Sequence, residues 1–227
     1  MTAPLTWGRR YLMCPPVHFG VLYEINPWMR REVTVDPDRA RTQWDRLVAT
    51  LREAGAEVEA MEPHPDVPDL VFTANAGLVN AASNVGSGGG GVDGQFVPSN
   101  FRHPERQPET PVNAARFAGR GWRVDPLPDA LDHEGAGDAL PFTPEGGRTV
   151  LLSGYSFRSD ATAATELSRL LGCPVRPLQL VDPRLYHLDL TFCPLDGRRA
   201  MAAPLGWDAY GLKVVEALVP ELLVLTD

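Results

Sequence analysis

The sequence predicts an α/β protein built from repeated modules, each with one helix and several short strands. Helix starts recur near residues 36, 110, 160 and 208, and each helix is followed by a short apolar run typical of a strand. The last two intervals are 50 and 48 residues long, which is a period typical of repeated supersecondary units. An α/β propeller fits this pattern, and a doubly wound parallel sheet ranks second because it needs near one-to-one alternation.

Capping residues and apolar spacing define the four helices. The first has Asp36 as N-cap and Pro37 at its first position, and it continues to Gly55. Its apolar side chains recur every three or four residues, which indicates one buried face. The other three helices are expected from Thr110 to Gly119, from Asp160 to Gly172 and from Asp208 to Pro220.

The expected strands are short runs rich in branched and aromatic residues. Four of them follow the helices, at Val58–Met61, Trp122–Val124, Val175–Leu180 and Leu222–Leu225. Five more fall between the helices, at Phe19–Tyr23, Leu70–Thr73, Thr149–Ser153, Leu188–Cys193 and Arg199–Ala203. The count favours about three strands for each helix.

A Gly-rich segment at about 80–95 explains why the first interval, 74 residues, is longer than the others. We interpret it as an insertion into a single domain that spans residues 1–227. A phosphate-binding loop is the alternative, but no Lys-Ser or Lys-Thr pair follows these glycines.

Composition narrows the class of function. The 227 residues carry a formal net charge of −8 and contain no block of consecutive Lys and Arg residues. A nucleic-acid partner is therefore not expected. No stretch approaches about 18 consecutive apolar residues and the N-terminus lacks an apolar signal core, so we expect a cytoplasmic protein that does not interact with a membrane. The three cysteines, Cys14, Cys173 and Cys193, form no CxxC pair, which fits a reducing compartment.

The first of three polar clusters runs from Asp69 to Asn75. If the residues between them form a strand, a spacing of six puts both side chains on one face, where they could hold a planar N–H donor. The alternative is an Asp and an Asn that cap the turns around an ordinary strand.

The second cluster is His133-Glu134-Gly-Ala-Gly-Asp138. Here Glu134 precedes glycines that let the backbone approach a ligand, and Asp138 could orient its neighbours. A polar turn between strands is the alternative.

The third cluster is His187-Leu-Asp189, in which a strand would place Asp189 on the same face as His187. Asp189 could then orient the imidazole while His187 exchanges a proton near neutral pH. An ordinary buried histidine is the alternative. A metal site is also conceivable, but the histidines and carboxylates lack the helical spacing of a hydrolytic zinc motif, so we expect no metal and no other cofactor.

Three arginines complete the candidate residues: Arg102 and Arg106 in one segment, and Arg158 in another. An arginine fork suits a substrate carboxylate. Solvated surface arginines, paired with Glu105 and Asp160, are the alternative.

In this order, the clusters resemble the guanidine-modifying (pentein) superfamily, which includes dimethylarginine dimethylaminohydrolase, arginine deiminase and the amidinotransferases. The resemblance covers nearly the whole chain. Its fragments are Met13-Cys-Pro-Pro-Val-His-Phe, Ile25-Asn-Pro-Trp-Met, Phe72-Thr-Ala-Asn75, Glu134-Gly-Ala-Gly-Asp138 and His187-Leu-Asp189.

The resemblance implies a propeller of ββαβ modules with pseudo-fivefold symmetry, and it implies a hydrolase or an amidinotransferase that acts on arginine-like guanidines through a covalent Cys-thiouronium intermediate. It assigns guanidinium binding to Glu134 and proton transfer to His187. It also implies that Asp69 and Asn75 contact the guanidinium side of the substrate.

Three further expectations come from the same resemblance. Asp138 belongs to the substrate-binding set, and Arg106 and Arg158 match residues that bind the substrate carboxylate. Asn75 stands where hydrolases of arginine or methylarginine usually have aspartate, and the Gly135–Gly137 stretch is one residue longer than usual. Both departures leave the identity of the substrate open.

The nucleophilic cysteine of such enzymes lies in the last module, which we expect to lie beyond Asp227. We therefore expect this chain to be C-terminally truncated and inactive as given. The alternative is a non-catalytic guanidine-binding protein. In either case a propeller lacking one module would expose two edges, which favours a homo-oligomer.

Overall fold

The structure is a computed structural model that describes residues 10–80 and 94–225. Within these residues the chain forms two compact units, one that ends at Thr73 and one that begins at Ala74. The expected Gly-rich insertion at about 80–95 falls largely on residues 81–93, which lie outside the described residues.

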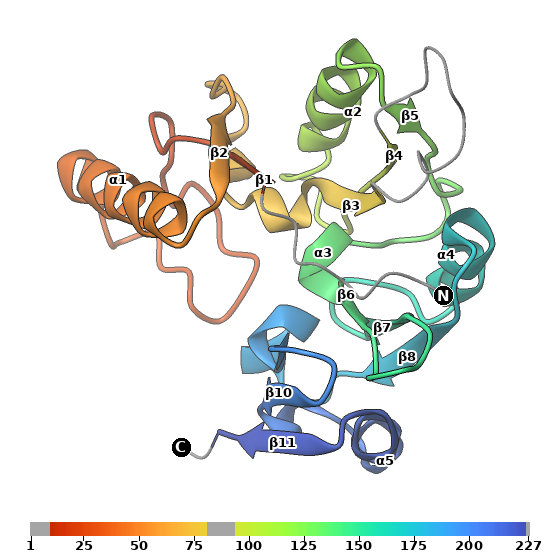
Figure 1. The fold of residues 1–227 in the computed structure, drawn as a ribbon. Coiled ribbons are helices and arrows are strands. Elements are labelled where there is room, and N and C mark those ends of the chain that lie inside the picture. Colours follow the sequence, from red (N-terminus) through yellow and green to blue (C-terminus); the bar gives the residue numbers. More distant parts are fainter. Residues whose placement is uncertain (1–9, 81–93, 226–227) are drawn as a thin grey trace. The chain divides into compact units, whose positions relative to one another are not determined.

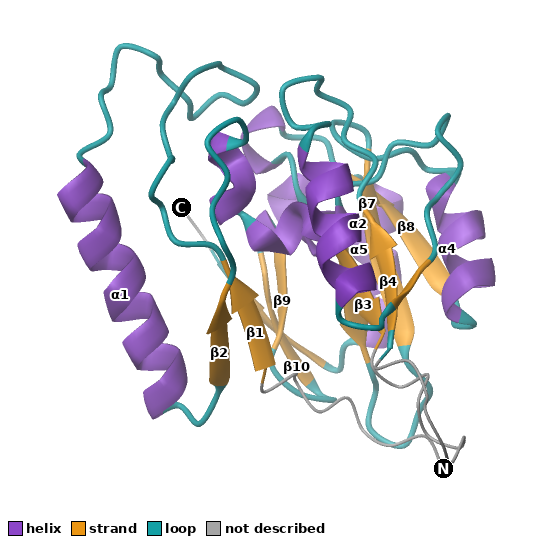
Figure 2. Ribbon diagram, turned by 90° about the horizontal axis from the view of Figure 1, so that it is seen from above, coloured by secondary structure: helices purple, strands orange, loops and turns teal. Residues whose placement is uncertain are grey.

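The N-terminal unit contains one βαβ element. Strand β1 (Arg10–Met13) pairs in parallel with β2 (Glu57–Ala60), and α1 (Pro37–Glu53) connects them. The α1 helix lies beside this two-stranded sheet (Figure 2). Its start is as predicted, because the Asp36 side chain accepts hydrogen bonds from two backbone N–H groups of the first turn, which would otherwise lack partners.

The second unit repeats one ββαβ pattern three times. In each module two antiparallel strands precede a helix, and the strand after the helix pairs in parallel with the second strand. The first module consists of β3 (Gly77–Asn80), β4 (Gln95–Pro98), α2 (Glu109–Gly119) and β5 (Arg123–Val124). The second consists of β6 (Ala139–Phe142), β7 (Val150–Tyr155), α4 (Ala163–Leu171) and β8 (Val175–Gln179). The third consists of β9 (Phe192–Pro194), β10 (Arg199–Ala202), α5 (Ala209–Leu218) and β11 (Glu221–Val224). Figure 1 shows the three modules in succession along the chain. The predicted α/β class and its module repeat are confirmed.

Two hydrophobic clusters join neighbouring modules. One packs Leu78 and Val97 of the first module against Leu151, Leu167 and Val175 of the second. The other extends from the second module into the third and is formed by Phe142, Leu152, Leu178, Leu180, Leu188, Phe192, Ala200, Ala202, Trp207, Val215 and Val219. Packing between modules therefore fixes the positions of the loops at their ends, because close-packed cores tolerate little displacement.

Several predicted strands are wrong. Residues 19–23 form no strand, and the predicted strand Leu70–Thr73 is replaced by two 3-10 helices, η1 (Pro68–Val71) and η2 (Thr73–Ala76). The predicted strand Leu188–Cys193 divides into the 3-10 helix η5 (Leu188–Leu190) and β9. Two further 3-10 helices are η4 (Pro183–Leu185) and η6 (Pro204–Gly206). No helix within residues 10–80 and 94–225 is long and apolar enough to cross a membrane.

A short helix, α3 (Gly135–Asp138), leads into β6 and contacts both β3 and η5. Gly135 has a φ of 59°, and a Cβ atom there would lie 2.7 Å from the backbone nitrogen of Gly77. A Cβ atom on Gly137 would collide with the Asn75 amide. We expected Gly135 and Gly137 to leave room for a ligand. Instead, they leave room for Gly77 and Asn75, so that α3 packs closely against the start of β3.

Replacing Gly135 with alanine should destabilise the protein by on the order of 2 kcal/mol, because the new methyl group meets backbone and the φ angle is unfavourable. Thermal unfolding would measure this loss as a lower Tm. Gly119→Ala is the matched control, since a Cβ atom at Gly119 meets no atom within 4 Å. A Gly135→Ala protein as stable as the control would contradict the account of α3.

Candidate functional site

Glu134 lies at the centre of the candidate site and is completely buried. Its Oε2 atom accepts a hydrogen bond from Arg158 Nη1 at 2.9 Å and lies 3.4 Å from His187 Nε2. Its Oε1 atom is also buried but has no hydrogen-bond partner among the described residues. A buried carboxylate oxygen without a donor is costly, so the site is suited to a ligand that brings one.

Asp138 holds the other side of His187. Its Oδ1 atom lies 3.0 Å from His187 Nδ1 and also accepts the Leu188 backbone N–H at 3.2 Å. Its Oδ2 atom accepts the Ser159 hydroxyl at 2.6 Å, and the same hydroxyl oxygen accepts the Glu134 backbone N–H at 3.1 Å. Ser159 thus links the Asp138 carboxylate to the backbone of Glu134.

The carboxylates determine the charge of His187. Burial by itself would lower the pKa of the imidazole, but the neighbouring Asp138 and Glu134 outweigh burial and raise it to about 9. His187 is therefore an imidazolium at neutral pH, with Nδ1 donating to Asp138. An imidazolium can act as a general acid.

Glu134 stays ionised for the converse reason. Burial alone would raise its pKa, but the hydrogen bond with His187 and the positive charge of Arg158 hold the pKa below its usual range. The site therefore offers a negative carboxylate in a place from which water is excluded.

The prediction that Asp189 orients His187 is wrong, because the structure gives that position to Asp138. The prediction assumed a strand, whereas His187 is the N-cap of η5, so alternate residues do not share a face. Asp189 lies in η5 with an exposed side chain, yet the protein around it removes enough hydration to raise its pKa to about 6.

Asn75 belongs to the same cluster, as its sequence position suggested. Its Nδ2 atom lies 3.2 Å from His187 Nε2 and 3.4 Å from the Glu134 carbonyl oxygen. Asp69 lies in η1 of the N-terminal unit, so the two residues do not flank a strand as predicted. The contact of Asp69 with a substrate stays a prediction.

Arg106 and Arg158 are not solvated surface residues, whereas the Arg102 side chain is 33% exposed and pairs with Asp160, as the alternative expected. Arg106 is buried, makes a bidentate ion pair with Glu109 and lies 4.5 Å above the Phe101 ring. Arg158 is also buried and lies 4.7 Å above the Tyr186 ring while it contacts Glu134. The roles of Arg106 and Arg158 in carboxylate binding stay predictions.

His133 is buried beside the site but is neutral. Its Nδ1 atom accepts the Gly135 N–H at 3.2 Å, and burial lowers its pKa to about 4. Among the described residues, no group of three His, Cys, Asp or Glu side chains is arranged to hold a metal ion.

Cys173 follows α4 and is half-buried, and burial raises the pKa of its thiol. Cys193 lies in β9 and is exposed, and Cys14 is buried in the N-terminal unit. A raised pKa makes Cys173 a poor nucleophile at neutral pH.

Four residues of the site share a position in the repeat. Asn75 precedes β3, Glu134 and Asp138 precede β6, and His187 precedes β9, so each module contributes the segment that leads into its first strand. Sequence reasoning missed Ser159 and Tyr186, since neither lies in a recognisable motif. It identified the other members of the cluster by their residue types.

Known proteins are similar to this chain over most of its length. The chain is 43% identical over 212 residues to the bifunctional arginine dihydrolase/ornithine cyclodeaminase ArgZ of Synechocystis, which covers 93% of this chain. It is 37% identical over 216 residues to the N(G),N(G)-dimethylarginine dimethylaminohydrolase of Mycobacterium tuberculosis, covering 95% of this chain and 65% of that one. No protein-family model matches the chain.

A solved structure covers most of the same fold. The N-terminal domain of ArgZ, an arginine dihydrolase of cyanobacteria, was crystallised bound to substrate as a variant in which serine replaces a cysteine. It matches with a TM-score of 0.84 at 39% identity, over 96% of this chain and 76% of that domain. The chain belongs to the guanidine-modifying (pentein) superfamily. The matched region covers only 28% of the full length of ArgZ.

Replacing Asp138 with asparagine should lower the pKa of His187 by about one unit or more, because the carboxylate charge beside Nδ1 is lost. The imidazole signals in an NMR pH titration would measure this change. Asp189→Asn is the matched control and should shift the pKa less. An equal or larger shift of the His187 pKa in Asp189→Asn would contradict the assignment of Asp138 and indicate that Asp189 orients the imidazole.

The free energy of unfolding should depend on pH through His187. Its folded pKa of about 9 lies above its ordinary value of 6.5, so its stabilising contribution is complete below pH 6.5 and is lost as the pH rises through 9. The loss is on the order of 2 kcal/mol. Thermal unfolding at pH 6 and pH 9 should show a larger decrease in Tm for the wild type than for His187→Gln, and equal decreases would contradict this.

Proposed function

We propose that the protein is a hydrolase of the guanidine group of arginine-like molecules. The observation that carries this proposal is the Oε1 atom of Glu134, which belongs to an ionised carboxylate and is buried without a hydrogen-bond donor among the described residues. A guanidinium group is planar, positively charged and rich in N–H donors, so it supplies both the charge and the hydrogen bond that Oε1 lacks.

The neighbouring groups suit the same cation. Asp189, whose pKa is raised to about 6, is mostly ionised at neutral pH and adds negative charge near His187. A guanidinium at Oε1 would also add positive charge beside His187 and lower its pKa from about 9 toward neutrality. Substrate binding would thereby prepare His187 to give up its proton.

The proposed reaction has two steps. A cysteine thiolate attacks the guanidinium carbon, and His187 donates its Nε2 proton to the departing amine, which leaves a thiouronium. Water then attacks this carbon, His187 accepts the proton of the water, and the C–S bond breaks to release a ureido product. Asp138 stabilises the imidazolium at the start and the end of the cycle.

We further propose that the attacking cysteine lies outside these 227 residues. Two properties support this: the pKa of Cys173 is raised, and Cys193 lies within β9, whereas the site residues lie in the segments before the first strands and in the turn after β7. The same properties favour the second candidate function, a guanidine-binding protein without turnover. We prefer hydrolysis to amidino transfer because the similar proteins ArgZ and the mycobacterial dimethylaminohydrolase are both named as hydrolases.

Replacing Glu134 with glutamine should weaken arginine binding by about 30-fold or more, since truncating a buried charge-assisted contact costs about 2–5 kcal/mol. Isothermal titration calorimetry with L-arginine would measure this. Glu145→Gln is the control, because Glu145 is exposed and its ion pair with Arg198 is solvated. Absence of arginine binding by the wild type, or equal affinity in both variants, would contradict the proposal.

A product assay would separate the two candidate functions. Because we place the attacking cysteine outside these 227 residues, the assay uses the natural full-length protein, incubated with L-arginine and analysed for ammonia and for citrulline or ornithine. Release of these products in proportion to that protein supports hydrolysis, whereas arginine binding without products supports the guanidine-binding protein.

A further inference from the structure

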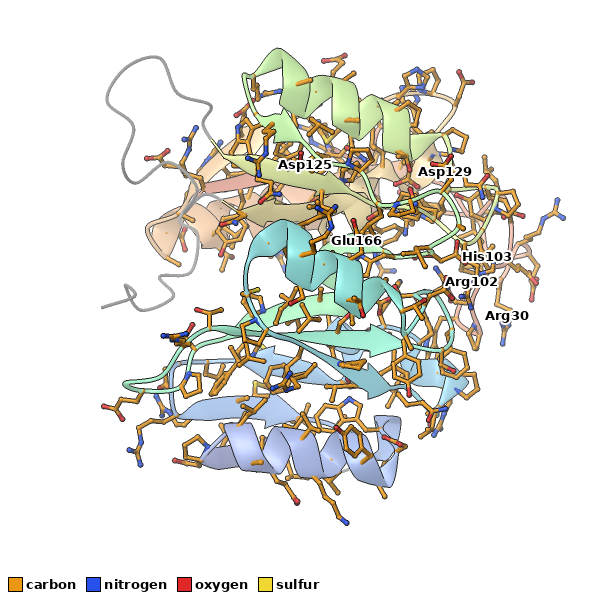
Figure 3. All side chains as sticks on the ribbon, turned by 90° about the vertical axis from the view of Figure 1, so that its right-hand side faces the viewer. Arg30, Arg102, His103, Asp125, Asp129 and Glu166 are labelled. Carbon is orange, nitrogen blue, oxygen red and sulfur yellow. The ribbon has the colours of Figure 1, made fainter. Side chains whose placement is uncertain are left out.

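We propose that Arg102 is a positioning residue, which clamps the turn at residues 156–160 so that Arg158 and Ser159 reach the two buried carboxylates of the site. Arg102 lies in the loop before α2, beside His103 (Figure 3). It touches neither Glu134 nor Asp138 in any hydrogen bond among the described residues. It acts through the turn that follows β7.

The guanidinium of Arg102 contacts this turn from several sides. Its Nη1 atom donates to the carbonyl oxygens of Ser156 at 3.0 Å and Phe157 at 3.3 Å. Its Nη2 atom donates to Asp160 Oδ1 at 2.8 Å. Both the first and the last residue of the turn are therefore held by one side chain.

The same arginine ties the turn to the segment that carries Glu134. Its Nε atom donates to Asp132 Oδ2 at 2.8 Å. The backbone N–H of Asp132 donates to Asp160 Oδ2, and the N–H of Asp160 donates to the Asp132 carbonyl oxygen, each at 2.9 Å. Asp132 lies two residues before Glu134, so the clamp fixes both partners of the Glu134–Arg158 contact.

The turn needs such a clamp because its backbone is strained. Ser156 has a φ of 117°, in a region that residues other than glycine rarely adopt, and it has the only positive φ among the described residues that are not glycine. Its N–H donates to the Ser159 carbonyl oxygen at 3.1 Å, which closes the turn. Strain of this kind persists only where the surroundings hold the backbone in place.

The turn delivers two side chains to the site. Arg158 Nη1 donates to Glu134 Oε2, and the Ser159 hydroxyl donates to Asp138 Oδ2. If the turn relaxed to an unstrained conformation, both carboxylates would lose a donor and His187 would lose its fixed partners. A displacement of about 1 Å in a site of this kind can cost about 100-fold in function.

Only an arginine has the geometry for this clamp. Its planar fork meets two carboxylates and two carbonyl oxygens at once, whereas a lysine ammonium is a point charge that cannot reach all four. Lysine at position 102 would keep the positive charge but should not keep the turn. The fork geometry can therefore be separated experimentally from the charge.

The first test needs no ligand and does not depend on the proposed function. In the wild type, the guanidinium N–H signals of Arg158 in NMR spectra should be distinct and slow to exchange, because Arg158 is buried against Glu134. Arg158→Lys assigns these signals by removing them. In Arg102→Lys and Arg102→Ala they should broaden or disappear, while in Arg199→Ala, whose arginine forms an exposed pair with Asp196, they should persist. Unchanged signals in both Arg102 variants would overturn the proposal.

A second test distinguishes positioning from stability alone. Arg102→Ala should lower the Tm by about 4 °C or more, and adding Ser156→Gly should recover part of this loss by relieving the strained φ. The double variant should still bind L-arginine at least about tenfold more weakly than Ser156→Gly alone, because Arg158 and Ser159 remain unclamped. This part of the test depends on the proposed function.

The outcomes separate the two proposals. If affinity recovers together with Tm in the double variant, Arg102 acts only on stability and the proposal is overturned. If the wild type binds no arginine, the proposed function fails, and the Arg158 signals alone decide whether Arg102 positions the turn.

Discussion

The ionised, completely buried carboxylate of Glu134 is the constraint on which the rest of the site depends. A charge without solvent must be balanced, and here Arg158 and His187 share one of its two oxygens. The second oxygen has no donor among the described residues. A buried carboxylate oxygen without a donor carries an energetic cost. The proposed guanidinium ligand would remove this cost by donating a hydrogen bond to that oxygen.

Asp138 and Ser159 extend this balance over the whole cluster. His187 lies between the carboxylates of Asp138 and Glu134, so its charge depends on the positions of both. Ser159 holds these positions, because its hydroxyl group donates to the Asp138 carboxylate and accepts the backbone N–H of Glu134. The arrangement is a connected network in which removing one member leaves another buried group unsatisfied. Such networks hold acid and base groups in place before any ligand arrives.

Features that depend on local sequence were predicted well. The caps Asp36 and Asp208 and the left-handed Gly172 mark helix ends because capping involves only neighbouring residues. The 3-10 segments were missed because tertiary contacts decide such short turns. Asp138 and His187 are 49 residues apart, so the true partner of the imidazole could not be read from spacing, and the nearer Asp189 was chosen instead.

Each of the three modules contributes to the site the segment that leads into its first strand. The second module also supplies Arg158 and Ser159, but no single module contains all the residues of the site. The affinity for a ligand becomes a measure of how well all three modules are packed together, and a bound ligand acts as a cross-link between them. Mutations in any inter-module core should then appear as weaker binding well before they appear as unfolding.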